Sequence, residues 1–172
     1  MIDFQVIQGD ITKSQVDAIV NAANTSLLGG GGVDGAIHRA AGPELDAACR
    51  KLNGCPTGEA KTTPGFRLPA KYIIHTPGPV WHGGQQNEAQ LLRNSYWHSL
   101  VQAEQHQCKT VDFPSISTGV YRFPLDQAAE IAVQTIKDFL TQAAVVHQVR
   151  LVAFDSVTKQ AYMQAKKKII GG

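Results

Sequence analysis

The sequence predicts an α/β domain with a largely parallel sheet that helices cover on both faces. Short apolar segments with strand character alternate along the chain with longer segments whose apolar residues recur at helical spacing. This alternation is typical of a parallel sheet, because each parallel connection needs a crossover that is usually a helix. The chain has 172 residues, enough for a hydrophobic core, and we expect a single domain over residues 1–172.

Two strands and two helices are expected in the early part of the chain. Apolar and polar residues alternate over residues 2–8, and the run DAIVN at Asp17–Asn21 has the composition of a buried strand. After a run of glycines, a helical pattern extends from about Val33 to Ala41, where Gly-Pro stops it. A second helix is expected over Glu44–Leu52, before an Asn-Gly turn.

The middle of the chain continues the alternation of strands and helices. Strands are expected at residues 60–66 and 71–76, the second with the apolar sequence KYIIHT. A helix is expected over Glu88–Gln107, since apolar residues recur there at helical spacing. The segment TVDFP at Thr110–Pro114 then predicts the next strand.

The last part of the chain adds two helices around one strand. An apolar stripe predicts a helix over Leu125–Leu140, and VRLVAF predicts a strand over Val149–Phe154. Ser156 is expected to cap a final helix that ends in Lys166–Lys168, where cations suit the negative end of the helix. Ligands of such sheets bind at the carboxyl ends of the strands, so the loops after DAIVN, TVDFP and VRLVAF are the candidate sites.

Composition excludes several classes of protein. Apolar residues make up 43% of the chain, and the net charge of +2 is too small to indicate binding to nucleic acid or to an anionic membrane. The first residues lack the basic start and apolar core of a signal peptide, and no apolar run reaches the roughly 20 residues of a membrane span. Three cysteines without a CxxC pair disfavour a disulfide framework and a structural zinc site. We therefore expect a cytoplasmic protein with no membrane partner.

A run of glycines, Gly29–Gly32, opens the first helical pattern. Gly30, Gly32 and Gly35 match the GxGxxG dinucleotide fingerprint. However, Thr25–Leu28 separate these glycines from the strand, and no acidic residue ends a following strand, so a dinucleotide-binding fold is disfavoured. No Gly-Lys-Ser/Thr follows, which excludes a Walker A loop. What remains is a row of backbone N–H groups before a helix N-terminus, an arrangement that binds anions.

One carboxylate, Asp34, lies in the first turn of this helix, where a negative charge is favourable for structural reasons alone. His38 follows four residues later and lies on the same helical face, which suits a packing or hydrogen-bonding role. An Asp–His pair is not a metal site by itself, and the chain has no HExxH motif or Cys/His cluster. We therefore expect neither a metal nor a cofactor.

A second loop, Ser115–Tyr121, also follows a strand and precedes a helix. It offers hydroxyl groups, Gly119 for a close backbone approach, and one aromatic side chain. Two loops of this kind in one small domain would hold a diphosphate from both sides.

Five short motifs stand in order along the chain: GDIT at 9–12, NAAN at 21–24, GGGGVDGAIHRAAG at 29–42, LPAKYIIHTPGP at 68–79 and ISTGVY at 116–121. Together they resemble macrodomains of the MacroD type, in particular the bacterial O-acetyl-ADP-ribose deacetylases, from about residue 2 to 155. The resemblance implies a three-layer α/β/α macrodomain with a central mixed, largely parallel sheet. It also implies binding of ADP-ribose and its esters, including proteins that carry mono-ADP-ribose.

The resemblance implies roles for residues at the adenine end of the ligand. Asp10 would accept a hydrogen bond from the adenine amino group, with Ile11 beside it. Phe154, at the end of the last strand, would stack on the adenine ring.

At the other end of the ligand, the resemblance implies a catalytic group of Asp34, Asn24 and Tyr121. Asp34 matches the catalytic carboxylate of the family, and Asn24 would bind the distal ribose. The remaining residues would line the ribose and the diphosphate: Gly31, Gly32 and Val33 in the first loop, and Ser117, Thr118, Gly119, Val120 and Tyr121 in the second.

The implied reactions both cleave an ester on the distal ribose and need an activated water. Asp34 would act as the general base, or would orient a water that a substrate phosphate deprotonates, and Tyr121 would close over the ligand. Two departures from the family pattern, Arg122 in place of glycine and Pro77 in place of an apolar residue, leave these assignments intact.

Two other functions compete with a hydrolase. A non-catalytic module that only reads ADP-ribose would share the two loops, but it would not need the carboxylate of Asp34. An RNA-binding or regulatory protein is suggested by Lys166–Lys168, but the weak net charge and the lack of an RNA-recognition motif disfavour a nucleic-acid partner.

Overall fold

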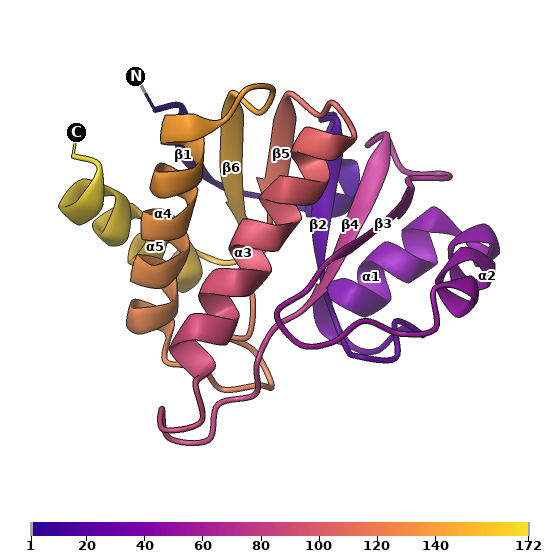
Figure 1. The fold of residues 1–172 in the computed structure, drawn as a ribbon, viewed down its shortest axis with the longest axis horizontal. Helices are drawn as coiled ribbons and strands as arrows, with labels where there is room; N and C mark the ends of the chain where they lie inside the picture. Colours follow the sequence, from indigo (N-terminus) through magenta and orange to yellow (C-terminus); the bar gives the residue numbers. More distant parts are fainter. Residues whose placement is uncertain (1, 172) are drawn as a thin grey trace.

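A six-stranded sheet runs through the centre of the computed structural model, which describes residues 2–171 (Figure 1). The strands are β1 (Phe4–Gln8), β2 (Ala18–Ala23), β3 (Lys61–Pro64), β4 (Tyr72–Pro77), β5 (Thr110–Phe113) and β6 (Gln148–Ala153). The helices are α1 (Gly32–Ala41), α2 (Pro43–Lys51), α3 (Glu88–Gln105), α4 (Leu125–Gln142) and α5 (Ser156–Ile169), with a 3₁₀ turn, η1 (Ile11–Lys13).

The sheet is mixed but mostly parallel. Its order is β1-β6-β5-β2-β4-β3, in which only the edge strand β3 is antiparallel to its neighbour β4. β2 lies between β5 and β4, and it pairs with β4 along its whole length from Ala18 to Ala23. The carboxyl ends of the five parallel strands therefore meet along one edge of the sheet.

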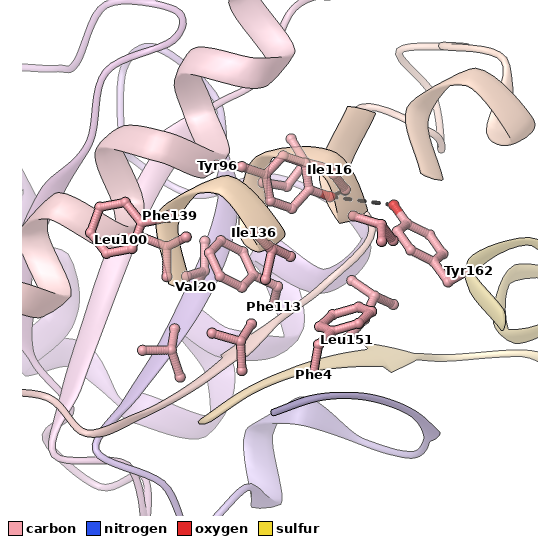
Figure 2. Close-up of a cluster of buried hydrophobic side chains, with 14 of the residues drawn as sticks. Phe4, Val20, Tyr96, Leu100, Phe113, Ile116, Ile136, Phe139, Leu151 and Tyr162 are labelled. Atoms are coloured by element: carbon pink, nitrogen blue, oxygen red, sulfur yellow. Dashed lines mark hydrogen bonds between the residues drawn. The ribbon is translucent and has the colours of Figure 1, made fainter. Parts of the chain in front are cut away.

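Different helices cover the two faces of the sheet. Successive residues of a strand point to opposite faces, so neighbouring residues belong to different cores. Val20 of β2 belongs to a core that it shares with α3, α4 and α5, whereas its neighbour Ile19 packs in a second core with α1 and α2. Figure 2 shows part of the larger core, with Phe113 of β5 and Tyr96 of α3, whose ring centroids are 5.1 Å apart. The α/β/α layers predicted from the sequence are confirmed.

Most predicted elements lie within a few residues of the observed ones, and the differences have local causes. β2 extends to Ala23, two residues beyond the predicted strand Asp17–Asn21. The prediction that Ser156 caps the last helix is wrong: the carboxylate of Asp155 accepts from the backbone N–H of Thr158 at 2.8 Å and is the cap. Asp155 has extended backbone, as a helix cap requires, whereas Ser156 is already helical.

The 3₁₀ turn η1 was not predicted. It follows β1 and is capped by Asp10, whose Oδ1 accepts from the backbone N–H and the hydroxyl of Thr12 at 3.0 and 2.7 Å. Within residues 2–171, no helix combines the length and the apolar composition that a membrane crossing requires.

Candidate functional site

A cavity of about 910 Å³ opens at the carboxyl edge of the parallel strands. Its walls come mainly from the segments that follow β1, β2, β5 and β6, the positions at which parallel sheets bind ligands. The structure brings every site residue predicted from the sequence to these walls: Asp10, Ile11, Asn24, Gly31, Gly32, Val33, Asp34, Ser117, Thr118, Gly119, Val120, Tyr121 and Phe154.

The loop between β2 and α1 is organised by the side chain of Asn24. Its Oδ1 accepts from Ser26 Oγ at 2.6 Å and from the backbone N–H of Leu27 at 3.0 Å, and its Nδ2 donates to the carbonyl of Gly29 at 2.7 Å. Leu27 is buried and anchors the loop in the smaller core. The loop is therefore held in its shape by contacts within the protein.

The glycines of this loop allow the backbone to fold tightly onto helix α1. A Cβ at Gly35 would lie 2.5 Å from the carbonyl oxygen of Gly30, closer than Cβ atoms approach other heavy atoms in proteins. At Gly31, by contrast, an added Cβ would meet no atom within 4 Å. Helix α1 starts at Gly32 with no side-chain cap, so N–H groups of its first turn are left for a ligand at the cavity wall.

Asp34 lies in the first turn of α1 and is only 5% exposed. Its Oδ1 accepts from Asn21 Nδ2 of β2 at 2.8 Å. Its other oxygen, Oδ2, lies beside Gly30, where an added Cβ would come within 3.1 Å of it. Burial raises the pKa of the Asp34 carboxyl, and the Asn21 hydrogen bond and nearby His38 lower it in part. A raised pKa makes a carboxylate a stronger base.

His38 lies between two carboxylates. Its Nδ1 is 2.7 Å from Asp46 Oδ1, within hydrogen-bond distance. Its Nε2 is 3.3 Å from Asp34 Oδ1 but is not aligned for a hydrogen bond. The helical spacing of Asp34 and His38 thus brings the two side chains together, as the sequence indicated.

Behind Asp34, a buried chain of polar groups crosses from β2 to β3. Asn21 Nδ2 lies 3.2 Å from His75 Nδ1, and His75 Nε2 lies 3.0 Å from Thr63 Oγ1. An amide nitrogen can only donate, so Nδ1 is the acceptor and Nε2 carries the ring proton. Burial, with a smaller contribution from His38, lowers the pKa of His75 to about 3, which keeps the ring neutral.

The second loop, from Ser115 to Tyr121, approaches the first from β5. Ser117 has a φ of 67°, a left-handed backbone that is uncommon outside glycine. Its hydroxyl is buried and has no hydrogen-bond partner within the described part of the chain. A Cβ at Gly78 would collide with this hydroxyl, so the glycine after β4 allows the loop to pack against the sheet edge.

A further loop before α3 supports the second loop from outside. Its Trp81 N–H donates to the carbonyl of Tyr121 at 2.8 Å, and the Trp81 ring packs against Phe123. The carboxylate of Glu88 accepts from the backbone N–H groups of His82, Gly84 and Gln86. Burial alone would raise the pKa of Glu88, but these hydrogen bonds lower it to about 2.

The remaining wall combines a fixed carboxylate with an exposed ring. Asp10 is held by its bonds to Thr12, which lower the pKa of its carboxyl although burial opposes them. Phe154, directly after β6, is 78% exposed, and Ile11 of η1 lies in the same wall. An exposed aromatic ring beside a cavity is available for stacking.

Two functional side chains were missed by reasoning from the sequence. Asn21 and His75 lie in strands that are otherwise apolar, and both are fully buried. A polar residue inside an apolar strand needs a buried partner, so its presence was the available signal. Within residues 2–171, no three His, Cys, Asp or Glu side chains gather in a way that would hold a metal ion.

Comparison with known proteins identifies the family. The sequence model of the Macro domain matches residues 20–132. A Macro domain-containing protein of Lactiplantibacillus plantarum is 65% identical over 166 residues, which cover 96% of this chain and 96% of that protein. The chain belongs to the Macro domain family.

Other macrodomains with more specific names are also similar to this one. An O-acetyl-ADP-ribose deacetylase of Salmonella newport is 56% identical over 162 residues, covering 92% of this chain and 90% of that protein. A solved mutant of the Oceanobacillus iheyensis macrodomain with ADPR has a TM-score of 0.92 and 45% identity, covering 97% of this chain and 93% of that one. The Trypanosoma brucei macrodomain in complex with ADP-ribose has a TM-score of 0.88 and 41% identity, covering 94% and 68%. The macrodomain fold that the sequence motifs implied is confirmed.

The close approach at Gly35 predicts a loss of stability when this macrodomain carries Gly35→Ala. The Cβ would overlap the Gly30 carbonyl, at a cost of about 1–3 kcal/mol for overpacking, which exceeds the roughly 0.5–1 kcal/mol that alanine gains in a helix. Urea denaturation measures the change in the free energy of unfolding. Gly31→Ala, with open space around its Cβ, is the matched control and should change stability by less than about 0.5 kcal/mol. Equal effects of the two variants would contradict the steric argument.

Neutral His75 predicts a pH dependence of stability. In the unfolded chain His75 takes up a proton near the ordinary histidine pKa of 6.5, whereas in the folded protein its pKa is about 3. The wild type should therefore lose stability as the pH falls below 6.5, by up to about 1.4 kcal/mol per pH unit. His75→Asn, whose amide oxygen replaces Nδ1 as acceptor, should lack this component. Urea melts of both proteins between pH 7 and pH 5 measure the difference, and parallel pH profiles would show that His75 protonates in the folded state.

Proposed function

We propose that this macrodomain, as one domain over residues 1–172, binds ADP-ribose in the cavity and hydrolyses esters of its distal ribose. Its substrates would be O-acetyl-ADP-ribose and proteins that carry mono-ADP-ribose on acidic side chains. The name of the Salmonella deacetylase and the solved macrodomains with ADP-ribose support this proposal. The observation that carries it is Asp34, a buried carboxylate in the cavity wall beside a helix N-terminus that suits an anion.

The diphosphate of the ligand would bind between the two loops. On one side, the start of helix α1 at Gly31 and Gly32 offers backbone N–H groups and a favourable dipole. On the other, Ser117 of the second loop lines the wall of the cavity. Thr118, Gly119 and Val120 would complete this second phosphate loop.

The adenosine part would lie against the opposite wall. Phe154 would stack on the adenine ring, and Asp10 would accept from the adenine amino group with Ile11 beside it. The bonds from Thr12 to Asp10 Oδ1 support this role, because they fix the carboxylate while leaving Oδ2 for a ligand. The low pKa of Asp10 keeps it an acceptor at neutral pH.

The chemistry assigned to Asp34 is general-base catalysis. Asn21 holds Oδ1, so Oδ2, beside the backbone of Gly30, would take a proton from water as the water oxygen attacks the ester carbonyl carbon. The tetrahedral intermediate would then break its bond to the ribose oxygen, and that oxygen would recover the proton. Asn24 and Tyr121 would orient the distal ribose, and Tyr121 would limit the access of bulk water. Base catalysis of this kind contributes about 10²–10⁴-fold.

Asp34→Asn tests the catalytic assignment. The variant keeps the shape of the side chain and an oxygen that can accept from Asn21, but it removes the base. We expect deacetylation of O-acetyl-ADP-ribose, and release of ADP-ribose from a glutamate-modified protein, to fall by about 10²–10⁴-fold. ADP-ribose should still bind, as measured by isothermal titration calorimetry.

Asp126→Asn is the matched control, since it makes the same chemical change at an exposed position outside this cavity. It should retain wild-type turnover. Turnover by Asp34→Asn at the wild-type rate would remove Asp34 from the mechanism. Binding of ADP-ribose by the wild type without turnover of either ester would instead identify a module that only reads ADP-ribose.

Phe154→Ala tests the position of the adenine. Loss of one stacked ring should weaken ADP-ribose binding by about 1–3 kcal/mol, the range for base–aromatic stacking. Calorimetry with ADP-ribose measures the change. Phe66→Ala, which removes a partly exposed ring that does not line the cavity, should bind as the wild type does. Unchanged affinity in Phe154→Ala would show that the adenine lies elsewhere.

A further inference from the structure

Two buried tyrosines from distant helices meet beneath the second loop. Tyr96 of α3 and Tyr162 of α5 are fully buried, and their hydroxyl oxygens lie 3.3 Å apart (Figure 2). Two phenylalanines would fill the same space without bringing polar atoms into the core. A buried hydroxyl is unfavourable unless it is hydrogen-bonded, so the partners of this pair indicate what it does.

Those partners belong to the second loop. Tyr96 accepts from the backbone N–H of Ile116 at 3.2 Å, and the Tyr162 hydroxyl lies 2.9 Å from Ser115 Oγ. Ser115 Oγ in turn lies 2.6 Å from Thr118 Oγ1, and Thr118 lines the cavity. The chain of hydrogen bonds therefore runs from the core of the protein to the wall of the candidate site.

Only the first member of the chain has a fixed role. The N–H of Ile116 can only donate, so Tyr96 accepts there. The proton of Tyr96 can go to the Pro114 carbonyl, at 3.5 Å, or to the Tyr162 hydroxyl, at 3.3 Å. Each of the hydroxyls of Tyr162, Ser115 and Thr118 can donate or accept in its contact with the next. In either direction, the contacts tie the positions of Ser115 and Thr118 to the two tyrosines.

The second loop needs such support because its backbone is strained. Ser117 in the loop and Arg122 directly after it have φ values of 67° and 62°, and neither is glycine. Strained residues keep such a conformation only where the surrounding structure holds them. The end of the loop is held by backbone bonds from Phe123 to Ser117 and from Trp81 to Tyr121. The hydroxyl chain holds its beginning.

We propose that Tyr96 and Tyr162 are positioning residues that hold the second loop in the shape that binds the ligand diphosphate. They act through Ile116 and Ser115, touch no ligand themselves, and fix the position of the Thr118 hydroxyl at the cavity wall. The identity of the ligand rests on the function proposed above. The assignment of the two tyrosines rests on the hydrogen bonds and the strained backbone.

Tyr96→Phe and Tyr162→Phe test the proposal, since each removes one oxygen and leaves the ring in the core. Each should weaken ADP-ribose binding about 3- to 10-fold in calorimetry, the equivalent of one hydrogen bond. The double variant should lose less than the product of the two single losses, because both act through one chain. In deacetylation, KM should rise while kcat stays within about 2-fold of the wild type. The base Asp34 lies outside this loop, and Tyr121 at its end is held by the separate backbone bond from Trp81.

Tyr72→Phe is the matched control. Tyr72 is the first residue of β4, and its ring packs against His106, away from the cavity. The variant should therefore bind ADP-ribose as the wild type does. Amide hydrogen exchange supplies a readout that needs no ligand: the N–H of Ile116 should exchange faster in Tyr96→Phe than in the wild type.

The outcomes separate this proposal from the function on which it rests. Thermal destabilisation of both variants with wild-type affinity and unchanged exchange at Ile116 would overturn the positioning role. Failure of the wild type to bind ADP-ribose would overturn the proposed function. In that case, faster exchange at Ile116 would still support the control of the loop by Tyr96, and unchanged exchange would overturn it.

Discussion

The hydrogen bond from Asn21 to Asp34 is the interaction on which the architecture of the site depends. It joins the central strand β2 to the first turn of α1 and holds a carboxylate in a wall that excludes most water. A buried carboxylate needs a donor, and Asn21 has its own orientation set by His75, which is held in turn by Thr63. This series of side-chain hydrogen bonds spans the three neighbouring strands β2, β4 and β3, so the position of Asp34 depends on the register of the sheet.

The two loops beside Asp34 achieve a defined shape in different ways. The first relies on the absence of side chains, because Gly35 lets the Gly30 carbonyl approach the helix, and on the bonds of Asn24. The second relies on the buried hydroxyls beneath it. Each loop includes a non-glycine residue with left-handed backbone, Leu27 in the first and Ser117 in the second. Both loops have these supports within the protein, so less order has to be created when a ligand binds.

Much of the architecture could be predicted because it is local. The alternation of strands and helices follows from hydrophobic spacing. The glycine run and Asp34 form a motif that can be recognised within a few residues of sequence. The cap of the last helix was mistaken for a local reason as well: Asp155 and Ser156 are both good caps, and the end of β6 decides which one has extended backbone. The candidate site residues followed from motifs that resemble macrodomains, and all of them line one cavity.

The fold class, the two loops and the carboxylate between them can be predicted from the sequence, because each depends on residues close together in the chain. The contacts that stabilise them are visible only in the folded protein. Asn21 and His75 are 54 positions apart, and Tyr96 and Tyr162 are 66 apart. Such pairs meet because strand pairing and helix packing bring them together, and no spacing in the chain encodes that contact. The buried polar residues signalled that partners were needed, and the fold determined which ones they found.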